Sequence, residues 1–469
     1  MIDLNPILTI ENKKALYRQL YEYIKNEIIK GNISAGNKLP SIRQLSDKLN
    51  LSRVTIENAY QQLISEGYVI SKPRSGLYVN EIDNYSYSSP TLPFQSTCIK
   101  TTPSKNIEYD FDPNGADLEA FPYATWKKIL SKLLLNDRND LYKPDESQGN
   151  LTLRKKLATY LNYSRNVQCD EGQIIIGATV QQLINIVSIL ISKNDMKKAA
   201  IEDPGCMEMK SIFKNLGYEV SRIPLDNDGV NIDNLYKSNA TVLYTTPSKQ
   251  FPSGMVTSIS KRLKILKWAN ENDALILEGD YDGEYRYIGN PIPSLQGLSL
   301  KDNVIYISNF SKYLFPSVCI SYMVLPKKLL PLYHIHCNLY EQSVSRLNQE
   351  VLFEFMDKGY FERHIHKMRK LYSKKHSLLI NLLNKEFNEI VKVIGKNAGL
   401  HILIEVKNGM TEEELVQAAL NYNIKVHPYS YYLLNSKLYE YPRILLGFGF
   451  LSLDDITEAV KILRIAWAI

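Results

Sequence analysis

The chain has 469 residues, 44% of them hydrophobic and 23% charged, and a formal net charge of +6. This length predicts about two to four domains, and the composition is typical of soluble globular proteins with large cores. No apolar run approaches the roughly 18 residues that span a bilayer, and the first residues show no signal-peptide pattern. Five scattered cysteines without CxxC spacing argue against a disulfide framework or a zinc site and favour the cytoplasm.

The positive charge is concentrated near the amino terminus. Residues 1–80 contain eleven Lys/Arg and seven Asp/Glu, so most of the net charge lies in about a sixth of the chain. A local positive excess favours a polyanionic partner through Coulomb attraction and counterion release. Basic surfaces are also common on proteins that bind no nucleic acid, so this signal alone is weak.

Three short helices are expected in this region. Apolar residues at a four-residue spacing predict a helix over 16–28 that ends near Gly31. A second helix is expected over 40–50. A third follows the N-cap candidate Ser52 and ends at Gly67.

Two short β-type runs at 68–70 and 77–79 enclose a basic tip at 72–76, which predicts a hairpin, or wing. Three small helices and a basic hairpin form the geometry in which a recognition helix enters the major groove. A small protein-binding domain with a solvated basic face is the alternative. The candidate DNA-binding residues are Ser41, Arg43, Ser52, Arg53, Thr55, Arg74 and Gly76.

Four strings with fixed spacing make the DNA-binding interpretation specific. They are LPSIRQL (39–45), LSRVT (51–55), AYQQLISEGY (59–68) and SGLYV (75–79). Together they closely resemble the GntR-type winged helix-turn-helix. In that family the arginines that match Arg43 and Arg53 contact operator DNA, so the resemblance implies a winged helix-turn-helix DNA-binding domain over 1–80.

Residues 81–106 are predicted to be a linker. The segment 81–105 is rich in Ser, Thr and Pro and shows neither the strand period of two nor the helical period of 3.6. The chain as a whole contains no internal repeat and no heptad pattern.

The remaining chain, 107–469, alternates short apolar runs with helical patterns. The runs are at 174–176, 199–201, 241–244, 275–277 and 304–307, and they are continuous, as strands buried on both faces should be. Helical patterns at 180–192 and 259–270 separate several of them. The pattern predicts an α/β domain with a mainly parallel central sheet, whose site lies beyond the carboxyl ends of the strands.

Polar residues follow three of these strands. Gly177-Ala178-Thr179 opens a helix, where backbone amides and a hydroxyl can hold a phosphate. Asp280-Tyr281-Asp282 and Ser311-Lys312 each follow a buried strand. A lysine among apolar residues loses its proton more easily and becomes a nucleophile for an aldehyde. Taken singly, an ordinary turn and a solvated lysine are the commoner explanations.

The order of six strings favours the chemical interpretation. They are GATVQQL (177–183), EDPG (202–205), TPSKQFPSG (246–254), DYDGEYRY (280–287), FSKYLFPS (310–317) and GLH (399–401). They resemble the fold-type I, pyridoxal 5′-phosphate (PLP)-dependent, aminotransferase-like domain of the MocR subfamily, bacterial regulators that join it to a GntR-type head. The resemblance implies a large part over about 107–375 and a small part over about 376–469.

By that resemblance, Lys312 would form an aldimine with PLP and Tyr281 would hydrogen-bond to the ring oxygen of the cofactor. The cofactor phosphate would be held by Ala178, Thr179 and Ser311, and from the neighbouring subunit by Tyr142. Arg443 is the candidate for binding a ligand carboxylate, although Leu445 fits the expected position as well.

The pocket departs from the family pattern at several positions. Gly279 replaces the aspartate that pairs with the pyridine nitrogen, and Cys319 replaces an arginine that binds phosphate. Cys206 and Lys249 replace an aromatic residue and a histidine. Either Asp280 takes over the missing role, or the site binds the cofactor weakly and catalyses little, or the pocket serves another ligand.

The resemblance implies a regulator that binds double-stranded operator DNA as a head-to-tail homodimer. It would sense PLP, or an amino-compound effector, through the aldimine at Lys312. Two alternatives stay open, namely an active aminotransferase with a DNA-binding appendage, and a regulator whose pocket no longer binds PLP. Gly279 and Cys319 argue against efficient turnover, so we expect at most weak transaminase activity.

Overall fold

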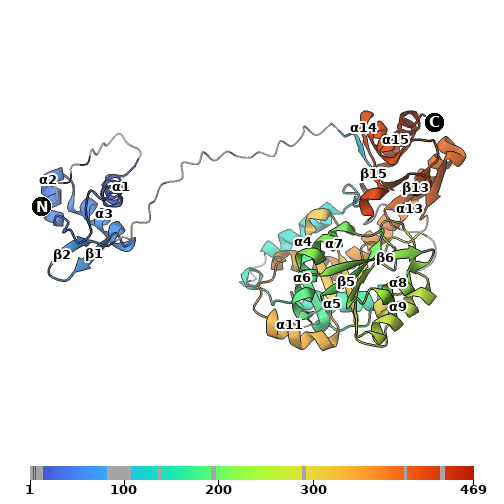
Figure 1. Cartoon of the computed structure of the whole chain (residues 1–469), viewed down its shortest axis with the longest axis horizontal. Coiled ribbons are helices and arrows are strands. Elements are labelled where there is room, and N and C mark those ends of the chain that lie inside the picture. The colour runs from blue at the N-terminus through green and yellow to red at the C-terminus, as the bar shows by residue number, and fades with distance from the viewer. Residues whose placement is uncertain are drawn as a thin grey trace. The chain divides into compact units, whose positions relative to one another are not determined.

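The computed structural model describes residues 4, 6, 14–81, 107–135, 139–191, 197–287, 292–395, 399–433 and 439–468. Contacts between residues divide the chain into two compact units, 1–101 and 102–469, which are drawn in Figure 1. All but the first residue of the expected linker 81–106 lies outside the described residues. No helix within the described part of the chain is both long and apolar enough to cross a membrane.

The first unit contains three helices and a hairpin. The helices are α1 (Leu16–Ile29), α2 (Ile42–Leu49) and α3 (Arg53–Ser65). The antiparallel hairpin consists of β1 (Val69–Lys72) and β2 (Gly76–Val79). Leu20, Leu45 and Leu63 are fully buried, one from each helix, because the apolar spacing places them on the inner faces. The structure therefore has the predicted winged-helix elements.

Serine caps fix where the second and third helices begin. The Ser41 hydroxyl accepts from the Gln44 amide at 3.2 Å, and the Gln44 side chain accepts from the Ser41 amide at 3.0 Å. The Ser52 hydroxyl accepts from the Thr55 amide at 3.1 Å. These bonds satisfy amides that have no partner inside a helix. Ser41 and Ser52 thus set the orientation of the exposed first turns of α2 and α3.

The second unit is built around an eight-stranded sheet in the order β4-β11-β10-β9-β8-β5-β6-β7. Its central pairs are parallel, while β11 and β7 are antiparallel to their neighbours. The strands are β4 (Ile174–Gly177), β5 (Lys198–Asp203), β6 (Glu219–Asp226), β7 (Gly229–Val230), β8 (Val242–Thr245), β9 (Leu275–Asp280), β10 (Val304–Asn309) and β11 (Ser321–Val324). The strands β4, β8, β9 and β11 are buried at every residue, which explains why their sequences are mostly apolar.

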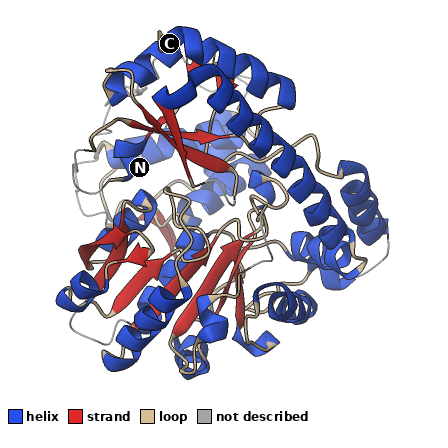
Figure 2. Cartoon of the chain, turned by 90° about the vertical axis from the view of Figure 1, so that its right-hand side faces the viewer, coloured by secondary structure: helices blue, strands red, loops and turns tan. Residues whose placement is uncertain are grey.

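Helices lie on both sides of this sheet (Figure 2). They are α4 (Tyr123–Leu135), α5 (Leu151–Arg165), α6 (Val180–Ile191), α7 (Met207–Asn215), α8 (Ile232–Lys237), α9 (Ile259–Glu271), α10 (Leu295–Leu298), α11 (Leu330–His336) and α12 (Arg346–Asp357). One core cluster, which includes Ile175, Leu277 and Ile307, lies between the strands and the helices α6 and α7. The parallel strands and their helices confirm the predicted α/β class.

A smaller, four-stranded antiparallel sheet follows in the order β12-β13-β16-β15. Its strands are β12 (Val391–Ile394), β13 (His401–Val406), β15 (His427–Pro428) and β16 (Arg443–Gly447), and the helices α14 (Glu412–Asn421) and α15 (Leu453–Ala466) accompany it. Helix α13 (Tyr360–Phe387) runs across the expected division near residue 376 without interruption.

A second departure from the expected division lies near residue 107. Strand β3 (Tyr109–Asp110) pairs in parallel with β14 (Ile424–Lys425), so the first described residues after the linker belong with the small part and not with the large one. Sequence spacing could not show this, because β3 has only two residues and its partner lies more than 300 positions away.

Candidate functional site

A cavity of about 340 Å³ lies beyond the carboxyl ends of β8, β9 and β10. Strand ends contribute Thr246, Gly279, Asp280 and Asn309, and the loop after β10 contributes Lys312. Side chains from other parts of the fold complete the lining, among them Asn114, Val180, Gln181, Cys206, Glu208, Phe251, Tyr281 and Tyr432. The parallel sheet therefore assembles the predicted lysine and tyrosine in one cavity.

Lys312, the predicted nucleophile, lies in this cavity. Its side chain is buried, its Nζ lies 4.5 Å from the centroid of the Tyr281 ring, and it donates to the Pro113 carbonyl at 3.3 Å. Burial lowers the pKa of Lys312 to about 8, because an ammonium group loses hydration in the interior. Near neutral pH an appreciable fraction of this amine is therefore uncharged and able to attack a carbonyl carbon.

The Tyr281 hydroxyl is buried and has no hydrogen-bond partner within the described part of the chain. The Tyr281 ring meets the edge of Phe251 at 5.8 Å, and burial raises the pKa of its phenol, which stays protonated. A buried hydroxyl without a partner costs free energy unless a ligand supplies one. The pocket thus offers a free donor next to the lysine.

Asp280, predicted to replace the missing cofactor carboxylate, is fully engaged by other groups. Its Oδ2 accepts from Arg165 Nε at 2.7 Å and from the Tyr306 hydroxyl at 2.6 Å, and its Oδ1 accepts from the Gly283 amide at 3.1 Å. Both Asp280 and Arg165 are buried. This geometry argues against the role that the sequence suggested for Asp280, because a ligand would have to break a buried ion pair.

The space beside Gly279 is occupied by Tyr244. A Cβ added at Gly279 would lie 2.6 Å from the Tyr244 hydroxyl and 3.0 Å from its ring carbon. Burial raises the pKa of Tyr244, so its phenol is neutral. Where the family has a carboxylate, this pocket has an uncharged hydroxyl.

The three predicted phosphate-binding residues lie outside the lining of the cavity, although Val180 and Asn309 beside them belong to it. The Ala178 amide donates to Gln182 at 2.9 Å and to the Ser343 hydroxyl at 3.0 Å. The Thr179 hydroxyl accepts from the Gln182 amide at 3.1 Å. The Ser311 amide donates to Asn309 at 3.0 Å. Their role in phosphate binding stays a prediction.

Arg443 lies at the beginning of β16 and lines a different cavity, of about 490 Å³, to whose lining Lys312 does not belong. Its Nε and Nη2 donate to Glu405 at 3.2 and 3.0 Å, and its guanidinium lies 3.9 Å from the Tyr439 ring centroid. A ligand carboxylate would have to displace Glu405. Leu445, the other candidate for this position, is fully buried in a cluster with Leu403 and Tyr432.

Tyr142, expected to reach a neighbouring subunit, is 76% exposed and lies outside the cavity. The segment that contains it contacts the segment that follows α11, because Gln342 donates to the Ser147 carbonyl at 3.0 Å. Leu339 in that second segment is 95% exposed. An exposed tyrosine and leucine on contacting segments suit a surface that another molecule covers.

The predicted DNA-contacting side chains are mostly exposed on the first unit. Arg43 and Arg53 lie in the first turns of α2 and α3, and Arg74 and Gly76 lie at the hairpin tip. Arg74 has a positive φ of 60°, a conformation that turns the wing sharply. Thr55 is half-buried, with its hydroxyl 2.8 Å from that of Ser52.

Sequence reasoning missed one basic residue beside the wing, Lys38, which lies near the same tyrosine as the predicted Lys72. Lys38, from the connector before α2, pairs with Tyr78 through an isolated antiparallel β-bridge of the backbone. Its Nζ lies 5.9 Å from the centroid of the Tyr78 ring. Lys72 lies 4.7 Å from the same ring. Lys38 therefore adds to the positive surface of the hairpin. Its position directly before the LPSIRQL string gave no such signal, because the hairpin lies more than 30 residues further along the chain.

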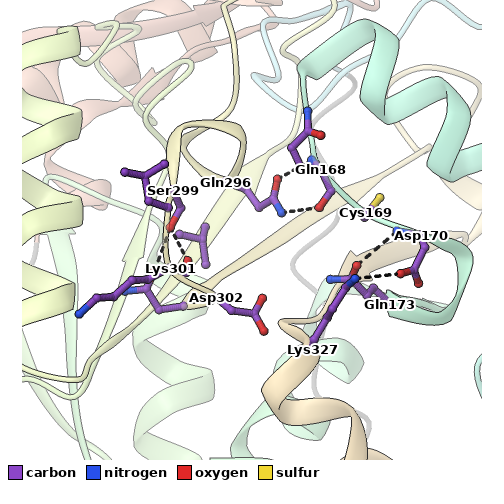
Figure 3. A pocket seen from close by; sticks show the side chains of 12 residues that line it. Gln168, Cys169, Asp170, Gln173, Gln296, Ser299, Lys301, Asp302 and Lys327 are labelled. Carbon is purple, nitrogen blue, oxygen red and sulfur yellow. Dashed lines mark hydrogen bonds and ion pairs between the residues drawn. The ribbon is translucent and has the colours of Figure 1, made fainter.

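A third cavity, of about 570 Å³, lies at the amino end of β10 (Figure 3). Gln168, Gln296, Lys301 and Lys327 are among its lining residues, and the Gln168 amide donates to Gln296 at 2.8 Å. Ligands of parallel sheets bind at the opposite, carboxyl edge. The cavity that contains Lys312, and not this one, therefore has the position expected of a ligand site in such a sheet.

Comparison with known families identifies both units. Residues 16–79 match the model for bacterial regulatory proteins of the gntR family, and residues 114–314 match that for aminotransferase class I and II. Two uncharacterized HTH-type transcriptional regulators of Bacillus subtilis (strain 168), YhdI and YdeL, are each 38% identical to this chain. The YhdI match covers 100% of this chain and 99% of the relative, and the YdeL match covers 100% of both.

A probable rhizopine catabolism regulatory protein, MocR of Rhizobium meliloti, is 28% identical over 96% of this chain and 94% of its own length. Among solved structures, the kynurenine aminotransferase of Pyrococcus horikoshii has a TM-score of 0.69 at 23% identity, covering 78% of this chain and 91% of that one. The α-aminoadipate aminotransferase LysN of Thermus thermophilus has a TM-score of 0.67 at 22% identity and covers 78% and 92%. These structures show that the second unit has the aminotransferase fold.

Proposed function

Because this chain belongs to the MocR subfamily of GntR-type transcriptional regulators, we propose that it binds operator DNA and senses PLP, or an amino compound that reacts with bound PLP. The supporting observation is the buried Lys312 amine, which lies over the ring of Tyr281, whose hydroxyl has no partner within the described residues, in a chain that also carries a winged helix. A buried amine of lowered pKa in a cavity is suited to react with an aldehyde.

DNA binding is assigned to the first unit. Helix α3 would enter the major groove with Arg53 directed at base edges, since Arg reads guanine through paired hydrogen bonds. Arg43 on α2 and Arg74 at the hairpin tip would contact phosphates. Ser41 and Ser52 would fix the helix amino ends against the backbone, where free amides attract anions.

The residues of the cavity fit PLP at two points. Within the described residues, Lys312 donates to a carbonyl and to no carboxylate, and the Tyr281 hydroxyl has no partner. Lys312 would hold the cofactor through its aldehyde, and Tyr281 would donate to the ring oxygen. The amide of Ala178 and the hydroxyls of Thr179 and Ser311 are proposed to bind the phosphate. PLP, when bound, supplies an electrophilic carbon that exchanges between amines.

The same cavity disfavours efficient transamination. Gly279 and Tyr244 present a neutral hydroxyl where a carboxylate would keep the ring nitrogen protonated, and Asp280 is held by Arg165. Without that counter-charge the ring is a poor electron sink. Lys312 and Tyr281 therefore suffice for reversible binding of an aldehyde, and we propose a sensor in place of an enzyme.

We further propose that the protein is a head-to-tail homodimer. The exposed Tyr142 and Leu339 lie on the contacting segments 139–149 and 339–346, and the Ser343 hydroxyl accepts from the Ala178 amide. A second subunit placed over these segments would bury apolar surface and bring its Tyr142 toward the phosphate-binding residues. Two heads would then read two half-sites of one operator.

The test of PLP binding is an absorbance titration of the full-length protein with PLP, followed by borohydride reduction and peptide mapping. We expect a new absorbance band and a stable label on Lys312. Lys312→Ala should lose both while retaining DNA binding. A wild-type protein that shows no band and no label on Lys312 would contradict the cofactor assignment.

Regulation is tested separately, by the affinity for an operator selected from random DNA, measured with and without PLP. We expect PLP to change the affinity of the wild type and to leave that of Lys312→Ala unchanged, because a ligand shifts a population only through differential binding to its states. An equal PLP effect on both proteins would exclude sensing through Lys312.

A further inference from the structure

Three ionisable side chains, Lys249, Asp282 and His401, form a cluster near Tyr281. Lys249 Nζ donates to Asp282 Oδ2 at 3.1 Å and lies 3.3 Å from His401 Nδ1. All three side chains are almost completely buried. Gly399 leaves room for the ammonium group, since a Cβ there would lie 1.8 Å from Lys249 Nζ and 2.3 Å from Asp282 Oδ2. The ion pair between Lys249 and Asp282 thus fits only because residue 399 is a glycine.

Histidine adds no charge to the cluster. Burial lowers the pKa of His401 well below its usual range, and the nearby lysines lower it further. The neutral ring therefore accepts from Lys249 at Nδ1, while its Nε2 donates to the Pro252 carbonyl at 3.2 Å. Burial also lowers the pKa of Lys249, and the adjacent Asp282 opposes this effect by favouring the ammonium form. The cluster is thus one ion pair, Lys249 with Asp282.

Lys249 of the cluster and Lys312 both lie near the aromatic ring of Tyr281. Lys249 Nζ lies 6.0 Å and Lys312 Nζ 4.5 Å from the centroid of Tyr281. Asp282, the residue after Tyr281, is the carboxylate with the largest effect on Lys312, and it favours the protonated amine. Lys249 opposes it, while Asp112 and Cys206 act in the same direction as Asp282 with smaller effects. Asp280, the other carboxylate of this strand end, is taken by Arg165.

We propose that Lys249 is a positioning residue for Lys312. Lys249 forms the ion pair with Asp282, so that this carboxylate does not become the counter-ion of the reactive Lys312 amine. The proposal rests on the proposed reaction of Lys312 with an aldehyde. If Asp282 were free, its charge would hold Lys312 as an ammonium ion, which cannot attack a carbonyl carbon. Lys249 therefore keeps the neighbouring lysine available without touching the ligand.

Pairing of Asp282 matters because an unpaired carboxylate in the interior attracts the nearest cation strongly. An opposite charge within about 4–6 Å moves the pKa of an amine upward by about 1–3. Burial acts the other way and is the largest influence on the pKa of Lys312, which is about 8. Removal of the Lys249 charge leaves Asp282 unneutralised, and Lys312 is the other lysine beside the Tyr281 ring.

The experiment measures the titration of the Lys312 amine in full-length protein without cofactor. Competitive acetylation by acetic anhydride at a series of pH values, read by mass spectrometry, gives the fraction of uncharged Lys312. The pH dependence of the absorbance change with PLP is recorded on the same proteins. The variants are Lys249→Met, Asp282→Asn and the double variant Lys249→Met/Asp282→Asn, which keeps the shape and removes both charges.

We expect Lys249→Met to raise the midpoint of Lys312 acetylation by about 1 pH unit or more. Asp282→Asn should lower it, because Lys249 then faces Lys312 without its partner. The double variant should return the midpoint close to that of the wild type. Fluorescence of the three tryptophans, all in the second unit, checks that each variant is folded.

An unchanged midpoint in folded Lys249→Met would overturn the proposal, as would equal shifts in Lys249→Met and the double variant. If Lys249→Met does not fold, an Asp282→Asn midpoint at or above the wild-type value would overturn it alone. Because acetylation needs no PLP, these outcomes are separate from the proposed binding of PLP, which fails if wild-type Lys312 forms no imine.

Discussion

The ion pair between Asp280 and Arg165 illustrates how a single side chain limits the chemistry of this pocket. Both groups are buried, Asp280 also accepts from the Tyr306 hydroxyl, and Arg165 Nη2 donates to the Ser248 hydroxyl at 2.7 Å. A carboxylate held this way has a structural role, because a ligand would have to replace its hydrogen bonds with Arg165, the Tyr306 hydroxyl and the Gly283 amide. We therefore infer that Asp280 stabilises the fold and is not free to pair with a ligand.

We predict that Arg165→Met lowers the free energy of unfolding of the second unit by about 3–5 kcal/mol, the usual cost of leaving one partner of a buried pair uncompensated. Urea unfolding followed by tryptophan fluorescence measures it, since all three tryptophans lie in that unit. The double variant Arg165→Met/Asp280→Asn should regain part of the loss. A single variant as stable as the wild type would show that the pair contributes nothing.

Restoring the family's aspartate is predicted to fail in this chain. In Gly279→Asp the new Cβ would lie 2.6 Å from the Tyr244 hydroxyl, and such overpacking costs about 1–3 kcal/mol. We expect a lower melting temperature and no gain in transaminase turnover. Gly279→Ala, which adds only the Cβ, should show a similar loss of stability. A stable, active Gly279→Asp would mean that Tyr244 moves away easily.

At the scale of elements, the exposed amino end of α3 and the hairpin tip are expected to play different roles on DNA. Arg53 begins a helix that Ser52 caps, so its position is well defined. We predict that Arg53→Ala weakens operator binding by about 1–3 kcal/mol and relaxes sequence preference. Arg18→Ala, an exposed arginine on α1, is the control and should change affinity little.

Arg74 is expected to bind phosphate and therefore to act on all sequences alike. Its φ of 60° suits glycine, so Arg74→Gly preserves the turn and removes only the side chain. We predict that the slope of log affinity against log salt concentration falls by about 1. An unchanged slope with specific and nonspecific DNA would exclude a phosphate contact.

Elements with strong local signals could be predicted from the sequence. The helix cap at Ser52, the second helix, the basic hairpin and the apolar runs of β4, β9 and β10 each depend on neighbouring residues, and the structure has them close to the predicted bounds. Strand β3 could not be predicted, because two residues carry no period and their partner β14 is remote. Tertiary pairing alone defines it.

The candidate site was predictable only in part for the same reason. The order of motifs placed Lys312 and Tyr281 in one cavity, and the structure has them there. Arg165 comes from a helix far from these motifs, and His401 from another sheet, so nothing in their local sequence pointed to Asp280 or Lys249. Buried polar partners are set by three-dimensional proximity, which a single sequence does not reveal.

For the whole molecule, the proposed dimer makes a clear prediction. Leu339→Asp places a charge on a surface that would be buried, and we expect a shift to monomers with weaker PLP binding. Sedimentation and the absorbance titration measure the two effects. Leu300→Asp is the matched control, because Leu300 is equally exposed but lies beside the cavity at the amino end of β10. Equal behaviour of both variants would contradict the proposed interface.

The first described residues after the linker connect the small sheet to the reactive amine. Phe111 forms backbone hydrogen bonds with Lys425 and Gly447, and Gly447 approaches so closely that a Cβ there would lie 2.0 Å from the Asp112 carbonyl oxygen. Two residues after Phe111, the Pro113 carbonyl accepts from Lys312. Residues 111–113 are therefore hydrogen-bonded to the strands of the small part at one end and to the Lys312 amine at the other. We expect a molecule that bonds covalently to this amine to take up hydrogens of Lys312 Nζ, to weaken its contact with the Pro113 carbonyl and so to loosen the residues that directly follow the linker.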